Sequence, residues 1–169
     1  MLWSLGNEPD TEHFPESARD YWRPLYEQAH TQDPQDRPVT MVCCQNDYTK
    51  DITTRTMDVV CINRYYGWYN LSGDLDNAAY AFKKELDFWE TIDKPLILSE
   101  YGADTVAGMH GFAPEMFTEE FQVEYYRTIN AVWMSAVLSW ASGRGTSRTS
   151  RPAGPDARGQ LQPQGAVHP

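Results

Sequence analysis

The sequence predicts an α/β fold in which parallel strands form a sheet and helices connect them. Short apolar or β-branched runs alternate with longer amphipathic segments, an alternation typical of parallel strands with helical crossovers. Three of these runs, 38–43, 57–62 and 95–98, are almost continuously apolar, as strands are when helices cover both faces of their sheet. A parallel barrel and an open doubly wound sheet both fit this pattern.

The first half of the chain predicts three strands and one helix. Residues 2–5 form an apolar strand that a Gly-Asn pair ends. A helix is expected over 17–32 from its three- and four-residue apolar spacing, although its internal Pro24 disfavours a helix interior. The runs 38–43 and 57–62 are the next two strands, with a short irregular stretch between them. The apolar face of this helix comprises Trp22, Leu25, Tyr26 and Ala29.

The second half predicts a helix, a strand and a further helix. The helix over 74–91 has an apolar stripe, and the strand 95–98 follows it directly. Another helix begins at Thr118, with two acidic residues in its first turn, where the helix dipole favours them. The two apolar stripes comprise Leu75, Ala79, Phe82, Leu86 and Trp89 in the first of these helices, and Phe121, Tyr125, Ile129 and Val132 in the second.

Composition excludes several classes of function. With 14 basic against 24 acidic residues the net charge is −10, which argues against nucleic acid as a partner. No apolar run reaches the ~20 residues of a membrane span, so no membrane association is expected. The cysteines Cys43, Cys44 and Cys61 have no metal-ligand spacing, and the histidines are scattered. We therefore expect reduced buried thiols, no zinc or histidine-based metal site and a cytoplasmic protein.

Composition changes abruptly towards the C-terminus. Residues 141–169 are rich in Gly, Pro, Ser and Arg and contain no Phe, Tyr, Ile or Met. Such a segment has too little apolar surface to offset the entropy of ordering. We expect one folded domain over 1–135 and a disordered Gly/Pro/Arg-rich tail over 136–169.

Polar residues follow the predicted strands, at the edge where parallel α/β folds place their chemistry. Glu8 and Glu100 come directly after apolar strands. Two carboxyl groups at one site are what glycosidic cleavage requires, one as acid and the other as nucleophile or base. The alternative is that these glutamates cap loops or form ion pairs. The nearby aromatic residues Tyr65, Tyr66, Trp68 and Tyr69 would offer faces for sugar stacking.

At these residues the sequence resembles the C-terminal catalytic barrel of the β-glucuronidases of glycoside hydrolase family 2. The resemblance covers about residues 1–132. NRYYGWY followed by SEYGADTVAG is its most specific part, whereas NEP alone is shared by many barrel glycosidases. The similar segments are WSLGNEPD (3–10), VVCINRYYGWY (59–69), SGDLD (72–76), KPLILSEYGADTVAG (94–108) and MFTEEFQ (116–122).

The resemblance implies a partial (β/α)8 TIM barrel, about strands four to seven with their helices, and a role for several residues. Glu8 would be the general acid/base and Glu100 the nucleophile, with Asn7 bonded to the sugar 2-hydroxyl. Such enzymes retain configuration, which implies carboxyl groups about 5 Å apart, and we expect Glu8 to be the less solvated of the two. The pocket for the glucuronic acid ring would be lined by Asn63, Tyr65 and Tyr69.

The resemblance also implies a small-molecule β-D-glucuronide or related glycoside as substrate, no metal or organic cofactor, and a homo-oligomeric parent enzyme. The alternatives are another family 2 exo-glycosidase, such as a β-galactosidase, or a non-catalytic carbohydrate-binding half-barrel.

The chain also departs from the family pattern. Segments resembling strands one to three, strand eight and the carboxylate-binding Asn-x-Lys pair are not found in it. We hypothesise that the tail is out-of-frame translation beginning near Trp133. Because a half barrel leaves two sheet edges unpaired, we expect the chain to be unstable and inactive by itself.

Overall fold

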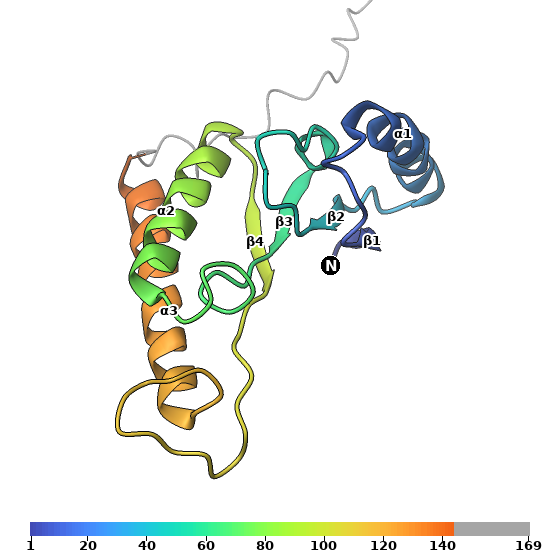
Figure 1. The fold of residues 1–169 in the computed structure, drawn as a ribbon. Coiled ribbons are helices and arrows are strands. Elements are labelled where there is room, and N and C mark those ends of the chain that lie inside the picture. The colour runs from blue at the N-terminus through green and yellow to red at the C-terminus, as the bar shows by residue number, and fades with distance from the viewer. Residues whose placement is uncertain (144–169) are drawn as a thin grey trace, which may run out of the picture.

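The computed structural model describes residues 1–143 and contains a four-stranded sheet (Figure 1). The strands lie in the order β1-β2-β3-β4, and all three neighbouring pairs are parallel. The predicted α/β class and the parallel sheet are therefore confirmed. The strands are β1 (Trp3–Asn7), β2 (Val39–Cys43), β3 (Val59–Asn63) and β4 (Leu96–Glu100).

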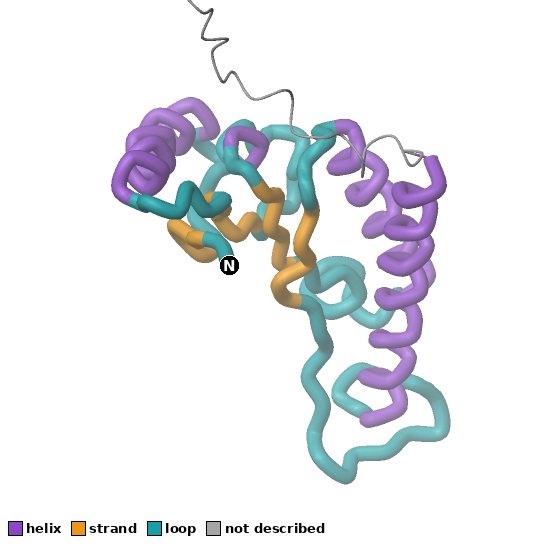
Figure 2. The backbone as a smooth tube through the Cα atoms, turned by 180° about the vertical axis from the view of Figure 1, so that it is seen from behind, coloured by secondary structure: helices purple, strands orange, loops and turns teal. Residues whose placement is uncertain are grey.

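Among the described residues, α-helices form two of the three connections between strands, and a third helix follows β4. They are α1 (Pro15–Gln32), α2 (Leu75–Thr91) and α3 (Glu119–Gly143), and a single 3₁₀ turn, η1 (Thr54–Thr56), lies between β2 and β3. Figures 1 and 2 show α2 and α3 side by side next to β3 and β4, with α1 at the other end of the sheet. Within residues 1–143, no helix combines the length and hydropathy needed to cross a membrane.

The start of α1 differs from the prediction. The helix begins at Pro15 rather than Ser17, and Phe14 precedes it without a side-chain cap. Proline is well suited to the first turn because its missing N–H would have no partner there. Pro24 does not interrupt the helix. Its ring leaves one carbonyl unpaired in the turn that contains the exposed Asp20, where water can replace the lost donor.

The core has two parts. The larger part lies between the sheet and the helices α2 and α3, and the smaller part lies under α1, where Trp22, Tyr26 and Ala29 pack on buried β2 residues. The predicted stripes of α2 and α3 are confirmed in the main, although Leu75, Ala79 and Val132 are only half-buried. All three cysteines are free. The fully buried members of the stripes are Phe82, Leu86, Trp89, Phe121, Tyr125 and Ile129.

The ends of the described fold leave sheet edges open. β1 and β4 each pair on one side only among the described residues, and Ile97 on β4 is 38% exposed.

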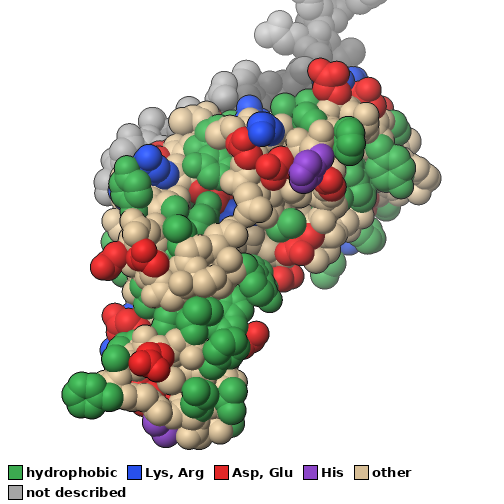
Figure 3. Space-filling view, viewed as in Figure 1, with side chains coloured by type: hydrophobic (Ala, Val, Ile, Leu, Met, Phe, Trp, Pro, Cys, Tyr) green, Lys and Arg blue, Asp and Glu red, His purple; other side chains and the backbone are tan. Residues whose placement is uncertain are grey.

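The last described helix extends further than predicted. It runs through Gly143, so residues 136–143 are helical rather than part of a tail. The tail prediction for 144–169 lies outside the described residues. Figure 3 shows carboxylate side chains spread over the face in view and few basic ones.

A hydrogen-bonded cluster around His30 links α1 to the sheet. His30 Nε2 lies 2.9 Å from Asp58 Oδ2, and His30 Nδ1 lies 2.7 Å from Asp36 Oδ1. Asp58, just before β3, also accepts hydrogen bonds from the backbone N–H of Val39 and the hydroxyl of Tyr26, each at 2.7 Å. The hydrogen bonds to Asp36 and then Asp58 raise the pKa of His30.

We expect the stability of the chain to fall as pH rises through the pKa of folded His30. A raised folded-state pKa means that the stabilisation is complete below the unfolded value of ~6.5 and is lost above the folded one. The urea concentration at the midpoint of unfolding, measured across this pH range, will show how stability depends on pH. His30→Asn will reduce this dependence. His13→Asn, at a side chain that is 73% exposed, is the control. An unchanged slope in His30→Asn would contradict this assignment.

Candidate active site

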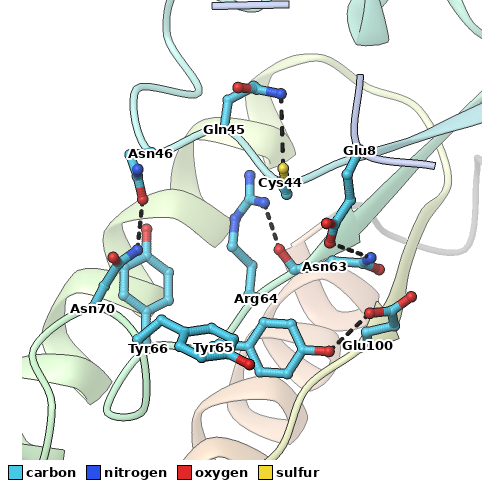
Figure 4. A pocket seen from close by; sticks show the side chains of 11 residues that line it. Glu8, Cys44, Gln45, Asn46, Asn63, Arg64, Tyr65, Tyr66, Asn70 and Glu100 are labelled. Carbon is cyan, nitrogen blue, oxygen red and sulfur yellow. Dashed lines mark hydrogen bonds between the residues drawn. The ribbon is translucent and has the colours of Figure 1, made fainter. Parts of the chain in front are cut away.

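A pocket of about 360 Å³ opens at the carboxyl ends of the strands (Figure 4). Parallel strands place the residues that follow them at one edge of the sheet, so segments distant in sequence meet here. Five of the six predicted site residues line the pocket, and Asn7 lies beside it. The lining residues are Glu8, Cys44, Gln45, Asn46, Asn63, Arg64, Tyr65, Tyr66, Tyr69, Asn70 and Glu100.

Glu8 directly follows β1 and has an unusual backbone conformation. Its φ is +54°, in the left-handed region that residues other than glycine seldom adopt. Its backbone N–H donates to the carbonyl of Val42 at 2.9 Å. Asn63 Nδ2 donates to Glu8 Oε1 at 2.7 Å and lies 3.4 Å from Asn7 Oδ1. The surrounding contacts thus hold both the backbone and the carboxylate of Glu8.

Glu100 ends β4 and is held by Tyr65. The Tyr65 hydroxyl donates to Glu100 Oε2 at 2.8 Å, and the Arg64 backbone N–H donates to the Glu100 carbonyl at 2.8 Å. The hydrogen bond to Glu100, together with burial, raises the pKa of Tyr65. The phenol therefore stays a proton donor to this carboxylate at neutral pH.

The side chain of Asn63 connects three strands. It is only 2% exposed, and its Oδ1 accepts a hydrogen bond from Ser99 Oγ at 2.6 Å. Its Nδ2 faces Glu8, as Figure 4 shows. Sequence reasoning did not find Ser99. The only available signal was its place directly before Glu100, and a serine there has no specific meaning by itself.

The turn after β3 carries the tyrosines of the rim. Gly67 has φ +88°, a conformation that glycine adopts without strain, and its N–H donates to the Asn70 carbonyl at 2.6 Å. This turn brings the rings of Tyr65 and Tyr69 to 5.1 Å between centroids. Tyr69 remains 69% exposed, so its ring borders the opening of the pocket.

A buried ion pair supports the floor of the pocket. The guanidinium of Arg64 contacts both carboxylate oxygens of Glu85 on α2, with the closest nitrogen–oxygen distance 2.5 Å. The remaining guanidinium nitrogen donates to the carbonyls of Cys43 and Asn63, at 2.9 and 2.7 Å. Glu85 also accepts hydrogen bonds from Tyr66 and Trp89. Sequence reasoning missed Glu85, and its signal was a carboxylate within the apolar stripe of α2.

One expectation about the site needs correction. Trp68 offers no face to a sugar, because it is 6% exposed and packs against Phe117 and Phe121. That Glu8 is the less solvated of the two carboxylates stays a prediction, since the side chains of Glu8 and Glu100 are both exposed. Within residues 1–143, no group of His, Cys, Asp and Glu is arranged to hold a metal ion.

Comparisons with known proteins agree with this arrangement. Residues 1–138 match the family described as glycosyl hydrolases family 2, TIM barrel domain. A β-glucuronidase from Streptococcus agalactiae is 42% identical over 136 residues, which are 79% of this chain and 22% of that protein. The human β-glucuronidase is 41% identical over 123 residues, 72% of this chain and 18% of that protein.

Solved structures are similar as well. The β-glucuronidase of Faecalibacterium prausnitzii superposes with a TM-score of 0.77 and 71% identity over 79% of this chain and 22% of that one. A Bifidobacterium dentium β-glucuronidase complexed with coumarin-3-O-glucuronide has a TM-score of 0.77 and 64% identity, over the same shares of the two chains. The chain thus spans about a fifth of the length of these relatives.

Proposed function

This chain belongs to the TIM-barrel domain family of the family 2 glycosyl hydrolases, and from that membership we propose that it supplies the catalytic carboxylates of a β-glucuronidase. The observation that carries the proposal is the shared pocket of Glu8 and Glu100. Each carboxylate accepts a hydrogen bond from a side chain at the end of β3, Glu8 from Asn63 and Glu100 from Tyr65.

Hydrolysis would proceed in two steps with retention of configuration. Glu100 attacks the anomeric carbon while protonated Glu8 gives its proton to the leaving oxygen, so that a covalent glycosyl ester forms on Glu100. Glu8, now a carboxylate, takes a proton from water, and that water releases the β-configured sugar. Tyr65 orients Glu100, and Asn7 would bond the sugar 2-hydroxyl. The exposed ring of Tyr69 would border the bound sugar.

Recognition of the glucuronate carboxylate requires groups outside the described residues. Arg64 is the only cationic residue that lines the described pocket, and its guanidinium is bonded to Glu85 and two carbonyls. We therefore expect no turnover from this chain alone. A homo-oligomeric parent enzyme also stays a prediction, as does a cytoplasmic location, for which the three free cysteines are the ground.

A graft tests the activity directly. Residues 1–138 of this chain would replace the matching segment of the F. prausnitzii enzyme, and the product would be assayed with aryl β-D-glucuronides and β-D-galactosides. We expect hydrolysis of glucuronides, with the β-anomer formed first by NMR. Preference for galactosides would favour another family 2 exo-glycosidase. A carbohydrate-binding half-barrel would be favoured by two results together. The graft would be inactive, and the chain would bind a glucuronide equally well with and without Glu100→Gln.

A further inference from the structure

We propose that Ser99 is a positioning residue for the acid/base Glu8, which it orients through the amide of Asn63. The inference rests on the proposed function and adds a residue to it. Ser99 on β4 donates to Asn63 Oδ1 at 2.6 Å, and Asn63 Nδ2 donates to Glu8 Oε1 at 2.7 Å. A hydroxyl on one edge strand thus acts on a carboxylate that follows the other.

The Ser99 hydroxyl favours the orientation in which the amide nitrogen of Asn63, and not its oxygen, faces Glu8. An amide presents either two donors or an acceptor, depending on how it is turned. Ser99 Oγ also lies 3.0 Å from the Ile62 carbonyl, but the shorter contact directs its single proton to Asn63. With Oδ1 bonded in this way, the N–H groups point to Glu8. Turned over, the amide would place its oxygen against the carboxylate, and two acceptors would repel each other.

Burial makes the restraint effective. Asn63 is 2% exposed, whereas Ser99 lies exposed on the open edge strand, so the hydroxyl closes the buried amide on its outer side. Without Ser99 Oγ, Oδ1 loses its protein donor, and the orientation of the amide depends on its contacts with Glu8 and Asn7 alone. The Nδ2 hydrogen bond that orients the Glu8 carboxylate is then less firmly held, whereas Glu100 keeps its own bond from Tyr65. The predicted defect is therefore confined to proton transfer by Glu8.

The dependence of rate on the leaving group separates this role from a general structural one. The phenol of a phenyl glucuronide needs the proton from Glu8 in order to leave, whereas the dinitrophenolate of an activated 2,4-dinitrophenyl glucuronide leaves without it. In the active graft, Ser99→Ala should lower kcat/KM, which reports the first step only, about tenfold for the phenyl substrate and less than twofold for the dinitrophenyl one. Ser99→Thr keeps the hydroxyl and should restore the rate.

Ser4→Ala on β1 is the matched control, since Ser4 Oγ donates to the carbonyl of Gly6, two residues along the same strand. Equal losses with both substrates, or no loss in Ser99→Ala, would overturn the proposal. A second measurement uses the full chain and needs no turnover. In the wild-type chain Glu8→Gln should shift the NMR signals of the Asn63 amide protons, and in the Ser99→Ala background it should not. If the graft is inactive but Asn63 still responds to Glu8 in this way, the proposed function is refuted and the orienting role is not. If Asn63 responds to Glu8 equally in Ser99→Ala, the orienting role itself is refuted.

Discussion

Glu100→Gln in the grafted enzyme will lower kcat/KM for aryl β-D-glucuronides by on the order of 10⁴-fold. The amide cannot form the glycosyl ester on which both steps depend. The substitution preserves size, and the amide oxygen still accepts the hydrogen bond that the Tyr65 hydroxyl gives to Glu100, so the fold should be unchanged. Steady-state rates and a circular dichroism spectrum of the same preparation will check both statements.

Azide rescue then distinguishes the two carboxylates. In Glu100→Gly, azide should attack the activated substrate directly and give the α-glycosyl azide. In Glu8→Ala it should open the covalent intermediate and give the β-glycosyl azide. Glu16→Gln, at an exposed carboxylate in the first turn of α1, is the control and should retain full activity. Exchanged azide products would mean that the roles of Glu8 and Glu100 are reversed.

Glu85→Ala will destabilise the fold by about 3–5 kcal/mol, because it leaves a buried guanidinium without its partner. Arg64 is 5% exposed and Glu85 is fully buried, so water cannot solvate the charge that remains. The Tyr66 hydroxyl and the Trp89 indole N–H also lose their acceptor. Denaturant unfolding of the chain, or the thermal midpoint of the graft, measures this effect.

A matched control lies on the same helix. Asp87 pairs with Lys83 one turn earlier at 2.7 Å, and both side chains are more than half exposed. Asp87→Asn should therefore change stability by less than about 1 kcal/mol. Combining Glu85→Leu with Arg64→Met removes both buried charges and should recover part of the loss. A double variant less stable than Glu85→Ala would show that the hydrogen bonds, not the unpaired charge, dominate.

Sequence reasoning identified the strands and the residues after them, because continuous apolar runs and strand-end carboxylates are local features. Glu8 and Glu100 were found for that reason, and the structure places both at the same pocket. The contacts of Ser99 and Glu85 depend on which strands and helices become neighbours, information that no single segment contains. The start of α1 was missed for a different reason, since a proline at the first helical position is a local signal that the expected range of 17–32 left out.

The order of the strands in the sheet has a consequence for synthesis on the ribosome. Each strand pairs with the one that precedes it in the sequence, so the nascent chain can add strands in the order in which they emerge. Domains synthesised in this way form from the N-terminus onward. Glu8 leaves the exit tunnel before Ser99 and Glu100, which arrive with β4. The carboxylate pair is therefore assembled only when β4 docks.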